Sequence, residues 1–240
     1  MSQEETPDET PYRRGMVVVA HADDAEWGCA GTMAKWCAEG WEVVYVLCTD
    51  GSKGSDDPLV TSEELIKIRR QEQLNAGKVL GLRKVVFLDY PDALLQPTLE
   101  LRRDIAREIR RYKPDVLICM SPVRRLSEHG YMGHPDHMAS GEAAMSAVFP
   151  TARDRLTFPE LLEEGLEPHK VREVWVAEHE EPNHYVDVSE HMDTAIEALK
   201  QHQTQVSEAD ADTHMRQWRN STGEKAGFEY AEAFKRIQLD

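Results

Sequence analysis

The sequence has 240 residues, of which 40% are hydrophobic and 30% are charged, and its formal net charge at pH 7 is −16. A chain of this length and composition can bury a sizeable core as one large domain. Its negative charge would repel a phosphate backbone or an anionic membrane surface, so nucleic acids and membranes are disfavoured as partners and a small neutral or cationic molecule fits better.

The amino terminus is predicted to be an acidic disordered tail over residues 1–12, followed by one domain over residues 13–240. The first ten residues, MSQEETPDET, contain no apolar run, whereas a secretory signal begins with positive charge and continues with an apolar stretch. No segment approaches the roughly 18 consecutive apolar residues of a membrane-spanning helix. We therefore expect a cytoplasmic protein, and its four isolated cysteines are expected to be free thiols.

Short apolar runs predict buried strands, which lie at residues 16–20, 43–48, 84–88, 115–119 and 171–176. Between them, apolar residues at three- and four-residue spacing predict helices over 28–39, 62–80, 98–112 and 134–148. The remainder is predicted as an irregular segment with a short helix over 151–170, an edge strand over 183–188, and helices over 193–203 and 224–237. This alternation predicts an α/β fold: a Rossmann-like, doubly wound, mostly parallel sheet with helices on both faces.

Polar motifs follow four of the predicted strands, at residues 21–24, 49–54, 89–92 and 121–137. In a doubly wound sheet, ligands bind beyond the carboxyl ends of the strands. We therefore expect these four segments to share one rim of the sheet.

Two of the motifs combine imidazole and carboxylate groups: His21-Ala22-Asp23-Asp24 and His134-Pro135-Asp136-His137. Zinc accepts both kinds of ligand, and a catalytic zinc site uses three protein ligands and leaves a position open for water. His21 and Asp24 straddle the turn, which leaves Asp23 free to act on water. His134 and His137 lie on one face of a helix start, so one can bind metal while the other faces substrate.

Each motif alone has a structural alternative, because Asp residues often cap helices and His-Pro-Asp can form a simple turn. Two such motifs at adjacent strand ends favour a metal site over two independent caps. The zinc could be replaced in such a site by iron, cobalt or manganese.

The segments AHADDAEWGCAG, TDGSKG, RRQEQLNAGKVLG and GHPDH resemble motifs of the LmbE/PIG-L family of zinc-dependent N-deacetylases. The resemblance extends from about Met16 to Phe234. It implies hydrolytic removal of an acetyl or other acyl group from the amide nitrogen of a small substrate, with an N-acetylglucosamine conjugate as the expected one. Members of this family often form homo-oligomers.

Carried over residue by residue, the resemblance implies that His21, Asp24 and His137 bind the metal. Asp23 would act as the general base, and His134 would stabilise the oxyanion.

The resemblance also implies roles around these groups. Asp136 would orient an imidazole, a contact that fixes the tautomer and raises the basicity of the ligand. Arg69 would reach the substrate rim with Glu72 as its ion-pair or positioning partner, and Asp92 would contact substrate.

This chain departs from the family pattern at several positions. Ala22 replaces a proline, and Ala93 stands after Asp92 where glycine is frequent. Some members have a catalytic tyrosine at the position of Met132; here Tyr131 comes one residue earlier, and the sequence leaves open whether its hydroxyl takes part.

Other features have simpler interpretations. The segment 49–54 is predicted to be a backbone turn that lines the site, because it lacks the Lys-Ser/Thr of a phosphate-binding loop. Trp27 and Trp36 lie nine residues apart on the first predicted helix and are expected to pack in the core and not to bind sugar. His184 and His202 are assigned no chemistry.

One rival function is disfavoured by the sequence, and two others stay open. A nucleotide-dependent transferase or dehydrogenase would need a glycine-rich turn after the first strand, where this sequence has carboxylates. A zinc-dependent amidase acting on a non-sugar amide or thiol conjugate would use the same groups. A non-catalytic metal-binding module would keep them without turnover.

Overall fold

A computed structural model describes residues 11–126 and 132–240 of the chain. Most of the predicted tail, residues 1–10, and Tyr131 therefore lie outside the described residues.

The described residues form a seven-stranded sheet with the order β3-β2-β1-β4-β5-β7-β6. Its strands are β1 (Arg14–Val19), β2 (Glu42–Thr49), β3 (Lys84–Tyr90), β4 (Val116–Cys119), β5 (Glu173–Ala177), β6 (His184–Asp187) and β7 (Ala231–Gln238). The first five strands are mutually parallel, and β7 pairs antiparallel with both β5 and β6. The predicted doubly wound sheet is confirmed, and β6 is an edge strand as expected.

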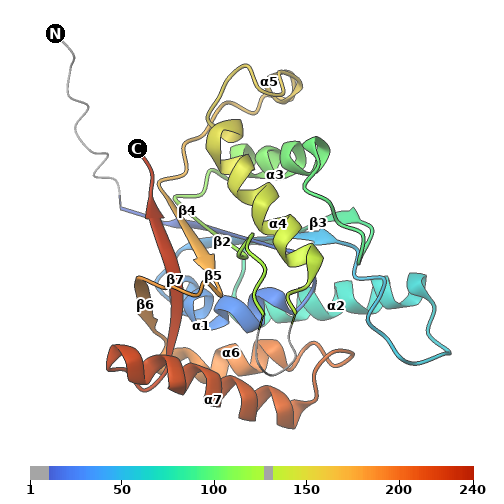
Figure 1. The fold of residues 1–240 in the computed structure, drawn as a ribbon, viewed down its shortest axis with the longest axis vertical. Coiled ribbons are helices and arrows are strands. Elements are labelled where there is room, and N and C mark those ends of the chain that lie inside the picture. The colour runs from blue at the N-terminus through green and yellow to red at the C-terminus, as the bar shows by residue number, and fades with distance from the viewer. Residues whose placement is uncertain (1–10, 127–131) are drawn as a thin grey trace.

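The helices cover both faces of this sheet (Figure 1). They are α1 (Asp24–Ala38), α2 (Ser62–Leu80), α3 (Leu99–Tyr112), α4 (Pro135–Ser146), α5 (Glu160–Glu163), α6 (Met192–Leu199) and α7 (Glu208–Ala226), with a short π-helix, η1 (Ala147–Ala152), and a short 3-10 helix, η2 (Ser189–His191). In Figure 1, α3 and α4 lie on one side, and α1, α2, α6 and α7 lie on the other. Among the described residues, none of these helices is both long and apolar enough to cross a bilayer.

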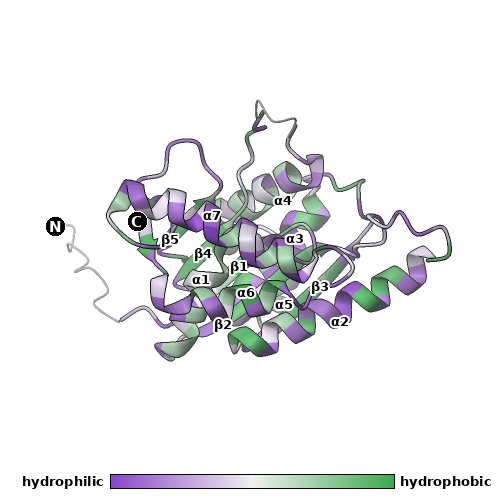
Figure 2. Cartoon of the chain, turned by 90° about the horizontal axis from the view of Figure 1, so that it is seen from below, coloured by the Kyte–Doolittle hydropathy of each residue, from purple (hydrophilic) through white to green (hydrophobic). Residues whose placement is uncertain are grey.

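The core is divided by the sheet into two layers. Val17 and Val19 of β1 belong to one cluster, while Met16 and Val18 belong to the other. This follows from the alternation of side chains along a strand. Figure 2 shows hydrophobic residues concentrated in the central strands and hydrophilic ones along the outer helices and loops.

Local sequence sets the bounds of α2. The Thr61 hydroxyl accepts a hydrogen bond from the Glu64 amide, and the Glu64 carboxylate accepts one from the Thr61 amide, which closes a capping box. The helix ends at Gly81, whose φ of 81° lies in the left-handed region that glycine adopts readily. The predicted range 62–80 is thereby confirmed.

The predicted helix over 224–237 is wrong. Helix α7, which the sequence analysis did not predict, ends before Gly227, and the chain then forms β7. Alanine, glutamate and lysine in β7 favour a helix locally, but this segment hydrogen-bonds to strands on both sides. Tertiary pairing therefore overrides a weak local preference.

Two other helix ends differ from the prediction. Helix α1 begins at Asp24, four residues before the predicted start at residue 28, so it starts inside the first polar motif. Helix α6 ends at Leu199 instead of residue 203.

Candidate active site

A polar cleft lies at the carboxyl ends of the parallel strands, where the sequence analysis expected a shared rim. Its volume is about 240 Å³, and it is lined by His21, Asp23, Lys53, Gly54, Arg69, Asp92, Ala93, His134 and Gln205. These residues come from all four predicted rim segments and from α2 and the segment after α6. We call this the rim cleft.

The turn after β1 holds Asp23 in an unusual backbone conformation. Its φ is 86°, in the left-handed region, where a non-glycine residue costs about 1–2 kcal/mol. Asp23 precedes α1, yet its side chain makes no capping hydrogen bond. Helix capping therefore does not account for this carboxylate, which lines the rim cleft instead.

The carboxylate of Asp24 lies between two imidazoles. Its Oδ2 is 3.3 Å from His21 Nδ1, and its Oδ1 is 3.1 Å from His137 Nε2. Asp24 Oδ2 also accepts a hydrogen bond of 2.7 Å from the His21 amide, which fixes the carboxylate across the turn. Ring nitrogens of His21, His134 and His137 lie within 4.8 Å of one another. This set of imidazole and carboxylate donors suits a transition-metal ion such as zinc.

The other nitrogen of His21 contacts two buried carboxylates. His21 Nε2 lies 3.0 Å from Asp92 Oδ1 and 3.3 Å from Asp136 Oδ2. The two oxygens of Asp136 also accept hydrogen bonds from the amides of Ala93 (2.7 Å) and Leu95 (3.2 Å). Because these acceptors already have partners in the protein, we interpret this second cluster as support for the His21 ring and not as another metal site.

His134 is the N-cap residue of α4, and its ring nitrogen Nδ1 accepts a hydrogen bond of 3.2 Å from the Asp136 amide. An accepting Nδ1 carries no hydrogen, so the neutral ring has its hydrogen on Nε2. The ring centroid lies 4.7 Å from that of His21 and 5.2 Å from that of His137. His134 thus offers a hydrogen-bond donor at the wall of the rim cleft.

The adjacent carboxyl groups of Asp23 and Asp24 differ in pKa. Burial, and then the negative charge of Asp24, raise the pKa of Asp23 to about 7. Burial opposes the ionisation of Asp24, but the positive charges of His137 and His21 outweigh it and hold the Asp24 pKa well below its usual range. Such a separation of two neighbouring carboxyl groups is typical of sites where one binds charge and the other moves protons.

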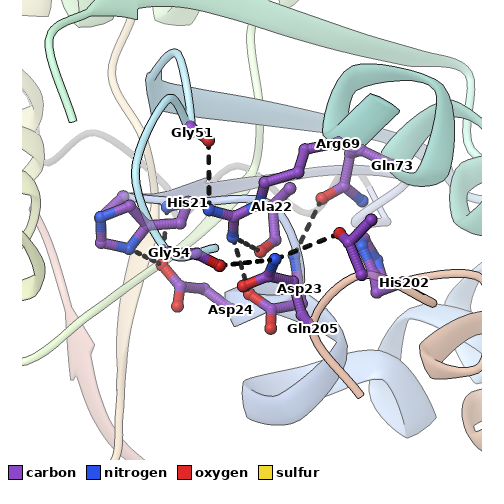
Figure 3. Close-up of polar contacts among 12 residues, drawn as sticks. His21, Ala22, Asp23, Asp24, Gly51, Gly54, Arg69, Gln73, His202 and Gln205 are labelled. Carbon is purple, nitrogen blue, oxygen red and sulfur yellow. Dashed lines mark hydrogen bonds and ion pairs between the residues drawn. The ribbon is translucent and has the colours of Figure 1, made fainter. Parts of the chain in front are cut away.

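Arg69 is buried against the first turn of the site (Figure 3). Its guanidinium donates to the carbonyls of Ala22 (2.9 Å), Gly51 (3.4 Å) and Lys53 (3.3 Å). It also lies 3.7 Å from Asp23 Oδ1 and 3.8 Å from Asp92 Oδ2.

Glu72 does not take the position predicted for it as partner of Arg69. Its carboxylate accepts from the Thr204 amide (2.8 Å) and hydroxyl (2.7 Å), and so joins α2 to the segment after α6. Arg69 and Glu72 are three residues apart and share a face of α2, but the Glu72 carboxylate bonds to Thr204 and not to Arg69.

A buried chain of polar groups, which was not predicted from the sequence, lies behind Asp23. The Asp23 amide donates to Gln73 Oε1 (3.3 Å), Gln73 Nε2 donates to Glu26 Oε1 (2.9 Å), and Glu26 Oε2 lies 3.2 Å from His202 Nε2. Figure 3 shows Gln73 and His202 beside Asp23. The only signal in the sequence was Gln73, four residues after Arg69 and hence on the same face of α2.

Two turns at the cleft require left-handed backbone. Gly51 and Gly54, with φ of 67° and 87°, form the turn predicted at 49–54, and Gly54 lines the cleft. Ala93 has a φ of 64°. This conformation explains why glycine suits the position of Ala93 better than alanine does.

Comparisons with known proteins point to one family. Residues 16–148 match the family described as GlcNAc-PI de-N-acetylase (PIG-L). The chain is 32% identical over 196 residues to diacetylchitobiose deacetylase of Thermococcus kodakarensis, covering 82% of this chain and 71% of that protein. It is 29% identical over 202 residues to a probable N-acetyl-alpha-D-glucosaminyl L-malate deacetylase 2 of Bacillus anthracis, covering 80% and 81%.

A solved structure agrees with these matches. The structure of N,N'-diacetylchitobiose deacetylase from Pyrococcus horikoshii superposes with a TM-score of 0.86 at 28% identity, covering 95% of this chain and 84% of that one.

Proposed function

The chain belongs to the PIG-L/LmbE family of metal-dependent deacetylases, and we propose that it is a zinc enzyme that removes the acetyl group from an N-acetylglucosamine conjugate. One observation carries the proposal. The Asp24 carboxylate lies between the imidazoles of His21 and His137. The neighbouring Asp23 carboxylate makes no hydrogen bond that caps α1.

His21, Asp24 and His137 are the proposed metal ligands. His134 belongs to the same group of imidazoles, but its Nδ1 is bonded to the Asp136 amide and its ring lines the rim cleft. When bound, zinc supplies a Lewis acid that lowers the pKa of water toward roughly 7 and polarises the amide carbonyl.

Asp23 is the proposed general base. It takes a proton from the attacking water as the new carbon–oxygen bond forms, and it later passes that proton to the amine as the carbon–nitrogen bond breaks. The pKa of Asp23, raised to about 7 by burial and by Asp24, suits a group that must both accept and release a proton near neutral pH. The hydrogen bond from its amide to Gln73 and the charge of Arg69 hold the carboxylate in the cleft.

His134 is the proposed oxyanion donor. Its Nε2 hydrogen is free to point at the carbonyl oxygen because Nδ1 accepts from the Asp136 amide. A donor of this kind is worth about 100-fold to 1,000-fold in turnover. Asp136 serves both imidazoles, since its amide fixes His134 and its carboxylate contacts His21.

The proposed substrate class follows from the relatives and from the cleft. The relatives are named for deacetylation of diacetylchitobiose and of an N-acetylglucosaminyl malate, both of which contain an N-acetylated aminosugar. The rim cleft offers carboxylate acceptors from Asp23 and Asp92 and donors from Lys53 and Arg69, which match sugar hydroxyls and an acidic substituent.

Amine release from N-acetylglucosamine and N,N'-diacetylchitobiose, with zinc present and then chelated, tests this function. We expect zinc-dependent release in the wild-type protein and in Asp56→Asn, a control at an exposed carboxylate, and none in Asp23→Asn. Zinc-dependent cleavage of a non-sugar amide alone would favour the amidase alternative. Zinc binding without cleavage of any amide would favour the non-catalytic module.

A further inference from the structure

A second cleft borders the proposed metal site. Its volume is about 280 Å³, and its lining consists of Asp24, Trp27, Arg125, His137, Glu178 and Trp218. It shares no lining residue with the rim cleft, yet two of its residues are proposed metal ligands. Both clefts therefore open onto the same cluster of ligands. We call this one the tryptophan cleft.

Trp27 was expected to pack in the core, and it does so only in part. Trp36 is 5% exposed and stacks on Trp41 at 4.4 Å, as a core residue does. Trp27 is half-buried and lines the tryptophan cleft. Trp218, on α7, is 37% exposed and faces the same cleft.

A buried arginine contacts the Trp218 ring and the backbone of Trp27. The Arg219 guanidinium lies over the Trp218 ring, with 4.3 Å from its carbon to the ring centroid, and it donates to the Trp27 carbonyl. Arg219 is itself 3% exposed, and its Nε lies 3.4 Å from Glu232 Oε1. Because the buried Arg219 side chain bonds to α1 and lies over the Trp218 ring, it restricts the position of this indole although the residue is partly exposed.

Two charged side chains complete the cleft. Glu178 follows β5 with a φ of 54°, a left-handed conformation that a non-glycine residue adopts at a cost in free energy. Its carboxylate and the Arg125 guanidinium add hydrogen-bond acceptors and donors beside the two indoles. Aromatic walls with a few convergent polar groups are typical of small-molecule sites.

We propose that the tryptophan cleft binds a second sugar ring of the substrate, while the rim cleft holds the ring that carries the acetylated nitrogen. This inference rests on the proposed function. The apolar C–H face of a pyranose ring can stack on an indole, whose face is electron-rich, while its hydroxyls bond to Glu178 and Arg125. The two charged groups offer no net charge, which suits a neutral sugar ring.

Binding to a catalytically impaired protein tests the proposal without relying on turnover. The dissociation constant of N,N'-diacetylchitobiose is measured by calorimetry on zinc-loaded Asp23→Asn and on the double variant Asp23→Asn/Trp218→Ala. We expect the double variant to bind the disaccharide about 5-fold to 10-fold more weakly, the factor typical of one lost aromatic contact. The preference for disaccharide over N-acetylglucosamine should fall by the same factor.

Phe228→Ala is the matched control, because Phe228 is 38% exposed just beyond α7 and lines neither cleft. It should bind the disaccharide as the parent does. Equal disaccharide binding with and without Trp218 overturns the proposal. So does a p-nitrophenyl glycoside that binds through Trp218 more tightly than the disaccharide, because the cleft would then select an aromatic group. Failure of deacetylation in the wild-type protein would instead count against the proposed function, since these binding measurements need no turnover.

Discussion

His21 Nε2 and Asp136 Oδ2 lie 3.3 Å apart, although 115 positions separate the two residues in the sequence. This contact joins the turn after β1 to the start of α4, and the Asp136 carboxylate also accepts from the amides of Ala93 and Leu95. A fixed imidazole loses less freedom when it binds a metal. The contact therefore pre-organises the proposed ligand His21.

We predict that Asp136→Asn weakens zinc binding by about 10-fold to 100-fold, the effect typical of removing a carboxylate that orients a ligating histidine. Competition against a chelator of known affinity measures this. Asp104→Asn, in a half-buried carboxylate on α3 that pairs with Arg107, is the control and should keep wild-type affinity. Unchanged zinc affinity in Asp136→Asn would show that the contact does not support the metal site.

His137 and His134 are predicted to have different roles. His137→Ala should lose zinc, because it removes a proposed ligand beside Asp24. His134→Ala should keep about one zinc per chain and lose about 100-fold to 1,000-fold in turnover, because it removes the oxyanion donor. Elemental analysis with steady-state kinetics separates the two. Equal zinc loss in both variants would make His134 a ligand.

Much of this site could be predicted from the sequence because its key residues are local to two motifs. His21, Asp23 and Asp24 follow one strand, and His134, Asp136 and His137 open one helix. A parallel sheet brings the carboxyl ends of its strands to one edge. Strands predicted before each motif therefore place both motifs at that edge. The left-handed backbone of Asp23 could not be predicted, since it depends on how the turn packs.

The remaining features depend on contacts between distant segments. The partner of Glu72 is Thr204, and the partner of Glu26 is His202, so neither pair leaves a spacing pattern in the sequence. Strand β7 has the composition of a helix and becomes a strand only because it fits between β5 and β6.

The buried pair of His202 and Glu26 is predicted to stabilise the fold. Both side chains are fully buried, so His202→Leu leaves the Glu26 carboxylate with the neutral Gln73 amide but without its positive partner, and should cost about 3–5 kcal/mol of unfolding free energy. Urea denaturation measures this, and a loss below about 1 kcal/mol would contradict it.

The same pair should make stability depend on pH. Burial opposes protonation of His202, but the charge of Glu26 and its hydrogen bond outweigh that and raise the His202 pKa above 6.5. A histidine whose pKa is higher in the folded state than in the unfolded state stabilises the fold fully at pH values below the unfolded-state pKa. This contribution is lost as the pH rises through the folded-state pKa. The stability difference between the wild type and His202→Leu should therefore be largest near pH 6 and shrink at alkaline pH. A difference that grows with pH would contradict the assignment.

Ala93→Gly is predicted to stabilise the protein by up to about 1 kcal/mol. Ala93 has a φ of 64°, and glycine relieves the left-handed strain while keeping the amide that donates to Asp136. Thermal unfolding measures the change. Ala143→Gly, inside α4, is the control and should destabilise by a similar amount. Equal destabilisation in both variants would show that Ala93 carries no strain.

In the proposed mechanism two adjacent carboxylates have separate roles: Asp24 holds zinc and Asp23 moves protons. Zinc content and amine release from N,N'-diacetylchitobiose, measured on the same preparations of wild type, Asp23→Asn and Asp24→Asn, test it most directly. We expect about one zinc per chain in the wild type and in Asp23→Asn, activity in the wild type alone, and loss of zinc in Asp24→Asn. Equal zinc loss in the two variants, or full activity in Asp23→Asn, would show that Asp23 and Asp24 do not have these separate roles.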